Sequence, residues 1–486
     1  MNPKKYKLKI VCLFFITFLT ACGGGGSSSG SSPSSNNSTP VTSSSGQSSI
    51  ATSIGVSSTP VSSVHSSIPS STNSSAALSS QSSVSSSTGN LVSIPLQSKI
   101  TKVQPMTGIV LWADSYNGTA LKTDDQYIQL EYAYVRPSDV VTGDKTYNWN
   151  AVDNLLEQIR ARGKQAILRW YYVYPGRETA VPSYIKARSD YHETTGMTEG
   201  QLTHFPDWSN AKLQQATLDF YTAFATRYDH DPRIAFVQAG FGLWGEYHIY
   251  EPGENLGVNF PSKVYQKTFL QHLDQVFTEL HWSISIDAGD TSNSPIATDT
   301  SLLALQFGNF DDSFMHKDHD DYNKSMWTVF SYTQRYKHSP HGGELSYYSD
   351  FDQKNALNVA GMYGRTYETL SKQFYITYMI GNDQPEYQSN ERIKQAGIAN
   401  GYKFHITEFK ASLSHSRVTV TNRGIAPIYY DAFITINGVR AQQSLKGLLP
   451  DQSLTVDIDS GGIQPLLTIE SDRLVSGQII QFEANL

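Results

Sequence analysis

Two glutamates in this chain share an unusual setting, with glycine before them and aromatic residues after them. Glu246 lies in "QAGFGLWGEYHIY", residues 238–250, and Glu344 lies in "PHGGEL", residues 340–345. Hydrolysis of a glycosidic bond usually needs two carboxyl groups, one as acid and one as nucleophile or base. A carboxyl group among aromatic rings is also where a raised pKa is expected. The two glutamates are therefore a candidate catalytic pair.

Other polar residues are candidates for supporting roles. Asp287 and Asp290, in "SIDAGD", are alternative partners for Glu246, and Asp287 is also a candidate for binding substrate. Arg136 or Arg169 could keep a nucleophilic carboxylate ionised, or could instead form ion pairs at the rim of the fold.

Aromatic residues are abundant, with 29 Tyr and 7 Trp. Amphipathic rings suit a surface that stacks on sugars, although they also fill cores. His248, two residues after Glu246, could donate a hydrogen bond to a sugar hydroxyl or to the carboxylates. The candidate sugar platforms are Trp112, Trp170, Tyr171, Trp244 and Tyr247. For each ring taken alone, core packing is the competing interpretation.

The segment "DDSFMHKDHDD", residues 311–321, combines five Asp with His316 and His319. A site for a hard cation is conceivable there. The spacing matches no EF-hand loop, and no glycine turn is present, so a solvated acidic loop is the prediction. We expect neither a metal nor another cofactor.

Residues 95–397 alternate short β-like runs with helical patterns. "GIVLWAD", "IQLEYAYV", "QAILRWYYV" and "RIAFVQAGFG" predict the first four strands, and an apolar stripe predicts a helix over residues 149–163. A further helix is expected near residues 353–371. About eight such units in roughly 300 residues predict a (β/α)8 barrel. Glu246 would follow the fourth strand and Glu344 the seventh, where reactive residues of such barrels lie.

After Gly401 the helical periodicity disappears. "FHITEFKASL", "RVTVTNRG", "YYDAFITING", "QQSLKGLLP", "SLTVDID" and "IIQFEANL" are short alternating runs separated by turns such as Asn437-Gly438. This pattern predicts a small antiparallel β-sandwich over residues 398–486, with no reacting groups of its own.

The segment "EYAYVRPSDVVTGDKTYNWNAVDNLLEQIRARGKQAILR" resembles the opening of many barrel glycoside hydrolases. "GLWGEYH" and "GGEL" are similar to the acid/base and nucleophile positions of the large retaining clan of (β/α)8 glycosidases. The resemblance implies that Glu246 is the general acid/base and Glu344 the nucleophile. Where the clan has Asn before its acid, this chain has Gly245. A similar arrangement with a C-terminal β-sandwich occurs in a little-characterised family of bacterial secreted barrel proteins.

The N-terminus resembles a bacterial lipoprotein signal. Four lysines precede the apolar run "IVCLFFITFL", which is too short to span a membrane, and "LTAC" ends at Cys22. The resemblance implies that residues 1–21 are removed and that Cys22 carries the lipid, with Gly23 favouring the outer membrane. Residues 22–94 are Ser-rich and predict a disordered linker.

The composition limits the kinds of molecule that this protein can be expected to bind. The only two cysteines are Cys12 and Cys22, so the domains have no disulfide to stabilise them. A net charge of -7 argues against a nucleic-acid partner. We expect a lipid-anchored monomer, surface-exposed or facing the periplasm, that hydrolyses a polysaccharide or oligosaccharide. The alternative is a lipoprotein that binds glycans without cleaving them.

Overall fold

The computed structural model describes residues 90–113 and 127–486. The predicted signal, the lipidation site Cys22 and nearly all of the Ser-rich linker lie outside the described residues. Within the two described ranges, no helix combines the length and the apolar character that a membrane crossing requires.

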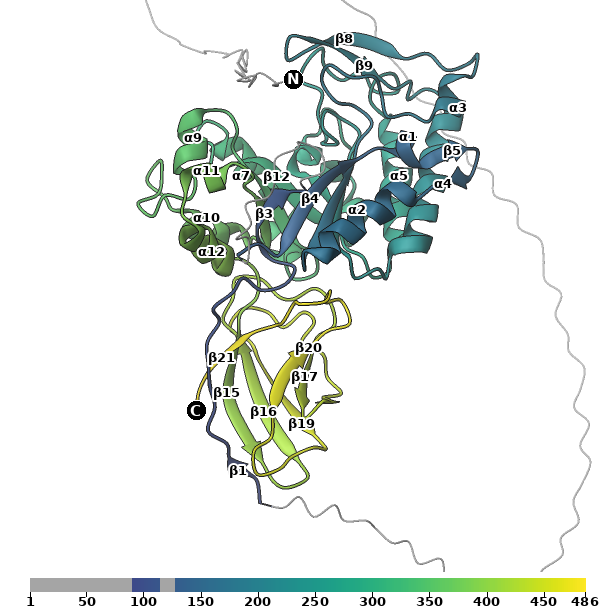
Figure 1. Cartoon of the computed structure of the whole chain (residues 1–486). Helices are drawn as coiled ribbons and strands as arrows, with labels where there is room; N and C mark the ends of the chain where they lie inside the picture. Colours follow the sequence, from purple (N-terminus) through teal and green to yellow (C-terminus); the bar gives the residue numbers. More distant parts are fainter. Residues whose placement is uncertain (1–89, 114–126) are drawn as a thin grey trace, which may run out of the picture. The chain divides into compact units, whose positions relative to one another are not determined.

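The predicted (β/α)8 barrel is confirmed, because eight parallel strands form a closed ring in which the last strand pairs with the first (Figure 1). The barrel strands, in chain order, are β3 (Gly108–Trp112), β4 (Leu130–Val135), β7 (Gln165–Trp170), β10 (Ile234–Ala239), β11 (Trp282–Ser285), β12 (Gly308–Phe314), β13 (His341–Leu345) and β14 (Tyr378–Ile380).

Helices cover the outside of the barrel where the apolar stripes predict them. Three of them are α2 (Asn150–Ala161), α4 (Ala211–Tyr228) and α5 (Lys263–Val276). In α2 the buried side chains recur at helical spacing, from Val152 to Ile159, and face the sheet. Asn210 caps α4, its side-chain oxygen accepting from two backbone N–H groups of the first turn.

The remaining elements are short. The helices are α1 (Pro137–Val140), α3 (Ser183–Lys186), α6 (Thr300–Leu303), α7 (Asp320–Val329), α8 (Tyr332–Arg335), α11 (Gln384–Tyr387), α12 (Asn390–Ala399) and the 3-10 turns η2 (Ile286–Gly289) and η3 (Ile296–Thr298). Two hairpins extend from the barrel loops, β5 (Val141–Gly143) with β6 (Thr146–Tyr147), and β8 (Thr194–Thr198) with β9 (Gln201–Phe205).

Two local predictions within the barrel were wrong. The helix expected near 353–371 is instead two helices, α9 (Asp350–Asn355) and α10 (Tyr367–Phe374). Gly361, between them, has φ +75°, and a Cβ there would meet the Arg365 carbonyl oxygen at 2.2 Å, so the chain turns where helix was expected.

The second error concerns the acidic segment 311–321. Strand β12 continues to Phe314, so Asp311 and Asp312 belong to the barrel wall and not to a solvated loop. Asp311 faces the helices and accepts hydrogen bonds from the indole N–H of Trp327 and the side-chain amide of Asn323.

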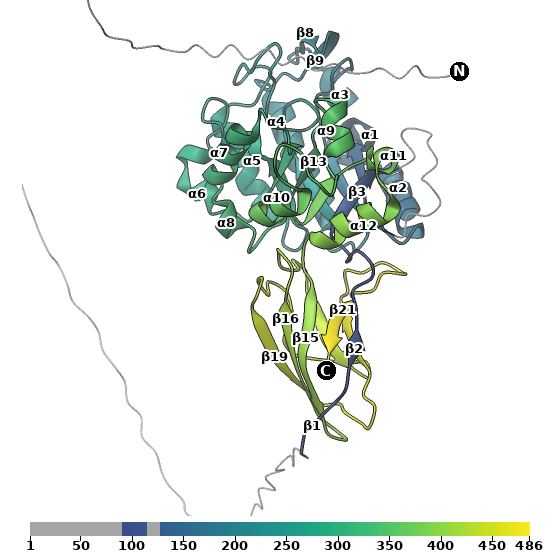
Figure 2. The same cartoon turned by 90° about the vertical axis from the view of Figure 1, so that its left-hand side faces the viewer.

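The C-terminal residues form the predicted sheets (Figure 2). The larger sheet runs β19–β16–β15–β21–β2, and the smaller runs β18–β17–β20. Their C-terminal strands are β15 (Phe404–Ala411), β16 (Ser416–Asn422), β17 (Phe433–Ile436), β18 (Val439–Arg440), β19 (Ser453–Ile458), β20 (Leu467–Glu470) and β21 (Phe482–Asn485). The strand expected at "QQSLKGLLP" does not form, and β20 was not predicted.

Residues before the barrel also belong to the larger sheet. β1 (Val92–Ser93) pairs antiparallel with β15, and β2 (Gln97–Ser98) pairs antiparallel with β21. Residues 97 and 98 fall within the range expected for the barrel, yet the structure pairs them with the last strand of the chain. The stretch that contains β1 and β2 runs along this sheet in both views (Figures 1 and 2).

C-terminal residues close the end of the barrel at which the strands begin. The Tyr430 hydroxyl donates to the Ala235 carbonyl at 2.5 Å, and its ring stacks on Phe236 with centroids 6.2 Å apart. The Arg473 guanidinium donates to the Ile234 carbonyl at 2.7 Å. Access to the barrel interior is therefore limited to the end at which the strands finish.

Candidate active site

A buried arginine is central to the site. Arg169 points into the barrel from β7 and is 0% exposed. Its Nε donates to the side-chain oxygen of Gln238 at 2.6 Å, and the Gln238 amide donates to the Tyr378 hydroxyl at 2.7 Å. The guanidinium carbon lies 4.4 Å from the centre of the Phe310 ring. These contacts from three other strands fix the orientation of the guanidinium.

The two predicted glutamates meet on this guanidinium. Arg169 Nη1 donates to Glu246 Oε1 at 2.8 Å, and Nη2 lies 2.7 Å from Glu344 Oε1. The second contact is a close ion pair without an aligned hydrogen bond. Because both oxygens contact one guanidinium, they lie no more than about 8 Å apart, which is below the upper limit of about 9.5 Å for paired glycosidase carboxylates. We call this arrangement the Arg169 bridge.

The loop after β10 explains the glycines before Glu246. The loop folds back on itself, with Gly242 N–H donating to the Glu246 carbonyl at 2.8 Å and Leu243 N–H donating to the His248 carbonyl at 3.0 Å. A Cβ on Gly242 would lie 2.1 Å from the His248 carbonyl oxygen. Gly245 has φ +76° and lies against the backbone of Trp170. An Asn at 245 would therefore be strained, which accounts for the departure from the Asn-Glu pattern.

The glycines before Glu344 are needed because a larger side chain would not fit, and not because the backbone has an unusual conformation there. A Cβ on Gly342 would meet the Tyr378 ring at 2.2 Å, and one on Gly343 would meet the Asp311 carbonyl oxygen at 2.2 Å. Gly342 thus leaves room inside the barrel for the ring that orients Gln238, and β13 carries Glu344 directly to the open end.

On the other side of Glu246, His248 and Asp287 form a second polar contact. His248 Nδ1 lies 3.1 Å from Asp287 Oδ2, and His248 Nε2 lies 3.8 Å from Glu246 Oε2. Asp287 Oδ2 also accepts a hydrogen bond from the Ser285 hydroxyl at 2.5 Å. Burial alone would lower the pKa of His248, but the hydrogen bond to Asp287 and the surrounding carboxylates outweigh it and raise that pKa to about 10. His248 and Asp287 therefore form an ion pair at neutral pH.

Asp312, on β12, completes a group of four. One ligand atom from each of Glu246, His248, Asp287 and Asp312 lies within 4.8 Å of the others. We call this group the carboxylate–histidine cluster, and its members are of the types that bind divalent metal ions. Burial, and then the charge of Asp287, raise the pKa of Asp312 to about 6.

The glutamates differ in electrostatic surroundings. Burial raises the pKa of Glu246 well above its usual value, and the charge of Asp312 raises it further, while Arg169 acts in the opposite direction. Burial also raises the pKa of Glu344, and Arg169 is the group that opposes it. Because the charge of Asp312 lies beside Glu246, Glu246 is the glutamate that is more readily protonated, and Glu344 is the one more readily ionised.

Aromatic residues line a pocket at the open end. Its lining includes two predicted platforms, Trp112 and Tyr171, and two residues that were not predicted, Tyr134 and Tyr174. The Tyr134 hydroxyl lies 3.4 Å from Arg169 Nη1, so this pocket reaches the Arg169 bridge. Trp244 is half-buried and packs edge-on against Tyr174, with centroids 6.5 Å apart.

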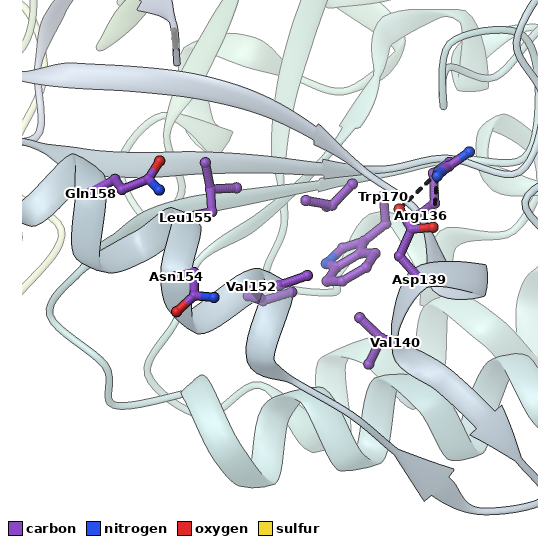
Figure 3. Close-up of a pocket in the computed structure, with 10 residues that line it drawn as sticks. Arg136, Asp139, Val140, Val152, Asn154, Leu155, Gln158 and Trp170 are labelled. Atoms are coloured by element: carbon purple, nitrogen blue, oxygen red, sulfur yellow. Dashed lines mark hydrogen bonds and ion pairs between the residues drawn. The ribbon is translucent and has the colours of Figure 1, made fainter. Parts of the chain in front are cut away.

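Three predicted site residues lie elsewhere. Trp170 is 1% exposed and packs against Phe220 of α4, so it belongs to the layer between barrel and helices. Arg136 pairs with Asp139 at 2.7 Å and, together with Trp170, lines a pocket outside the barrel beside α1 and α2 (Figure 3). Tyr247 is 0% exposed and packs against Phe260. Trp170 and Tyr247 are therefore too deeply buried to stack on a sugar, and Arg136 is paired with Asp139 and has no described contact with the Arg169 bridge.

The two aspartates that were alternative partners for Glu246 lie in different places. Asp287 joins the carboxylate–histidine cluster, whereas Asp290 accepts a hydrogen bond from the backbone of Ser292. Asp312 is the principal residue that sequence reasoning missed, because it was assigned to the acidic loop. The signal that could have found it is the alternation of Phe310 and Asp312 along a strand, with both side chains facing the interior.

Comparisons with known proteins do not identify a family. No protein-family model matches the chain, and no curated protein matches it. Among solved structures, it is similar to the galactosidase domain of alpha-galactosidase-sucrose kinase, AgaSK, at 12% identity, with 74% of this chain and 55% of that chain covered and a TM-score of 0.34. The GH36 alpha-galactosidase AgaB from Geobacillus stearothermophilus gives 12% identity, coverage of 73% and 55%, and a TM-score of 0.33.

A third similar structure is N2152 from Neocallimastix frontalis, with 8% identity, 78% of this chain and 96% of that chain covered, and a TM-score of 0.33. The chain spans about half the length of the two galactosidase chains. The closed ring of eight parallel strands, and not these likenesses, identifies the fold.

Proposed function

We propose that this protein is a surface-anchored glycoside hydrolase that cleaves a polysaccharide or oligosaccharide with retention of anomeric configuration. The observation that carries the proposal is the Arg169 bridge, in which one buried guanidinium contacts both Glu246 and Glu344 at the open end of the barrel. Two carboxyl groups close together in one site are what glycoside hydrolysis usually requires.

The surroundings of each glutamate support the role that we propose for it. Glu246, beside Asp312, holds the proton and donates it to the glycosidic oxygen as the bond between that oxygen and C1 breaks. Glu344 attacks C1 and forms a glycosyl ester. Water then attacks C1 while Glu246 accepts its proton, which releases the sugar and restores both carboxyl groups.

Arg169 contributes to both steps. Its positive charge favours the ionised form of Glu344 before attack. Its hydrogen bond to Glu246 and its ion pair with Glu344 hold the two carboxyl groups close together. The aromatic pocket that includes Trp112 and Tyr134 supplies flat apolar surface for a sugar ring beside the bridge.

The anchoring part of the proposal rests on the "LTAC" motif and Cys22. We expect Cys22→Ala to release the protein from the membrane fraction and to leave its thermal unfolding unchanged. Fractionation of cells that express the variant, followed by immunodetection, measures this. A variant that stays in the membrane fraction would reject the lipoprotein assignment.

The catalytic part is tested with Glu246→Gln and Glu344→Gln on a panel of polysaccharides and oligosaccharides. Each change keeps the side-chain shape and removes the proton chemistry, so turnover should fall by about 10²–10⁴-fold with substrate binding retained. Proton NMR of the first product shows whether the anomeric configuration is retained. Asp290→Asn is the matched control, since Asp290 lies outside both groups and should keep full activity.

Two outcomes would contradict the proposal. Unchanged turnover in either glutamine variant would remove that residue from the mechanism. Tight glycan binding without turnover by the wild-type protein on every substrate would support a binding lipoprotein instead.

A further inference from the structure

The carboxylate–histidine cluster contains a buried oxygen that accepts no hydrogen bond from an N–H or O–H group of the described residues. Glu246 is 3% exposed, and its Oε2 has no hydrogen-bond partner among the described residues. The other oxygen of Glu246 is held by Arg169, so Oε2 faces the cluster, 3.8 Å from His248 Nε2. Asp312 lies close enough to share a proton with Glu246, but it is a carboxyl group and not a fixed donor. A buried carboxylate oxygen without a fixed donor is costly, unless a proton or a cation takes that place.

The spacing of the four ligand atoms fits a single ion. They lie within 4.8 Å of one another. Around an ion with bonds of about 2.0–2.2 Å, ligand atoms lie about 3–4.4 Å apart, so the cluster would need to contract only slightly. Small side-chain rotations are sufficient for that.

The neighbours of His248 resemble those of a metal-binding imidazole. Metal-bound histidines usually donate their other ring N–H to a carboxylate. Here Nδ1 contacts Asp287 Oδ2, which Ser285 also holds, and this leaves Nε2 directed toward Glu246 Oε2. The imidazole is therefore oriented before any ion arrives. On binding, the ion displaces the proton from Nε2 to solvent, and Asp287 must turn so that one of its oxygens meets the ion.

We propose that Glu246, His248, Asp287 and Asp312 bind one divalent first-row transition-metal ion at the open end of the barrel. One imidazole nitrogen with three carboxylate oxygens suits Mn²⁺ or Zn²⁺ better than Ca²⁺, which prefers oxygen ligands throughout. The three carboxylates supply the negative charge that such an ion needs.

Binding does not depend on the proposed hydrolysis, but it has a consequence for it. Oε2 is the atom that carries the acid proton in the proposed mechanism, and an ion at Oε2 excludes that proton. The bound ion is therefore an inhibitor, and its site overlaps only one half of the catalytic pair. Glu344 contacts the other terminal nitrogen of Arg169 and is not one of the four residues of the cluster.

The test uses purified, chelator-treated full-length protein with MnCl₂ or ZnCl₂ as the only added ligand. Equilibrium dialysis with elemental analysis gives the stoichiometry, and isothermal titration calorimetry gives the affinity. We expect one ion per chain. Asp312→Asn and His248→Gln should each weaken binding at least 10-fold, with circular dichroism confirming that each variant is folded.

Glu344→Gln and Asp290→Asn are the matched controls and should bind the ion like the wild-type protein. Glu344→Gln also separates the two proposals, because it should lose hydrolysis and keep the metal. Wild-type protein that binds no stoichiometric ion at millimolar Mn²⁺ or Zn²⁺ would overturn the metal site. Binding that is unchanged by both Asp312→Asn and His248→Gln would overturn it too.

Discussion

The eight barrel strands build two different interiors at their two ends. Where the strands begin, Phe236 stacks between the rings of Tyr378 and Tyr430, with centroids 5.3 and 6.2 Å away. Two residues further along β10, Gln238 instead binds a buried guanidinium, and beyond it lies the carboxyl group of Glu246. Alternation along a strand decides which side chains point inward, but the height along the barrel decides what surrounds them.

The closed end is stabilised mainly by rings and backbone carbonyls, and the open end by opposite charges. Arg473 and Arg169 illustrate the contrast, because both guanidinium groups are buried. Arg473 donates to the carbonyls of Ile234 and Asp229, whereas Arg169 faces two carboxylates. A charge paired with carbonyls adds stability, while a charge paired with carboxylates also controls their protonation.

The largest expected effect comes from breaking the Arg169 bridge. Arg169→Met leaves Glu246 and Glu344 buried without their cation, which should cost about 3–5 kcal/mol of unfolding free energy at neutral pH. Both carboxyl groups would then have folded pKa values further above their unfolded values, so the loss should be smallest near pH 4 and should grow as pH rises. Urea unfolding at several pH values measures this.

Arg473→Met is the comparison for that experiment. Its hydrogen-bond partners are carbonyls, which do not titrate, but its charge also helps to lower the pKa of His281. Its destabilisation should therefore vary little with pH well above about pH 6.5, where His281 is neutral in both the folded and the unfolded chain. An Arg169→Met penalty that is equally flat with pH would show that the two carboxyl groups are not coupled to the guanidinium as described.

A smaller effect on stability is expected from a histidine at the closed end, and only at acid pH. His281 packs against Tyr429 and Tyr430, and burial is the main cause that lowers its pKa to about 4. The unfolded chain takes up this proton near pH 6.5 and the folded chain does not, so stability should fall as pH drops from about 6.5 to about 4. His281→Gln should flatten this part of a plot of melting temperature against pH.

The matched control is His230→Gln, because the His230 side chain is 79% exposed. Its curve should follow the wild-type curve. An unchanged acid slope in His281→Gln would mean that the closed end does not contribute to acid sensitivity.

The smallest expected effect concerns substrate contact. Trp244→Ala removes a half-buried ring beside Tyr174, and the lost stacking should raise KM about 5–10-fold with kcat little changed. Trp170→Ala provides the contrast, since that ring fills the layer against α4 and its loss should lower stability by about 3–5 kcal/mol. If the Trp170 variant folded normally and only its KM were raised, Trp170 would have to contact the substrate.

The fold was predictable because its signal repeats along the chain. Each strand and helix of the barrel has its own apolar pattern, and an error such as the one at residues 353–371 does not change the count of units. The pairing of Glu246 with Glu344 was predictable in the same way, because glycine and aromatic neighbours mark both positions. Their approach follows from strand order alone.

The rest of the site depends on whether each side chain points into or out of the barrel, and the sequence indicates this poorly. Trp170 and Arg169 are adjacent, yet one points outward and the other inward, and nothing in "LRWYY" says which. Asp312 was missed because the end of β12 is rich in acids and looks like a loop. Tyr247 lies next to Glu246, but the folded-back loop turns its ring into the core.

The pairing of β1 and β2 with the C-terminal sheet has a mechanical consequence. A chain held at Cys22, as proposed, transmits any pull on its linker first to residues 92–98. If the barrel holds a glycan, as proposed, that pull passes through β1 and β2, and their hydrogen bonds to β15 and β21 carry part of the load. The barrel strands lie beyond this sheet along the path of the force. Tension between the cell and a bound polymer would therefore be resisted by the terminal sheet before it could distort the geometry of Arg169 and its two glutamates.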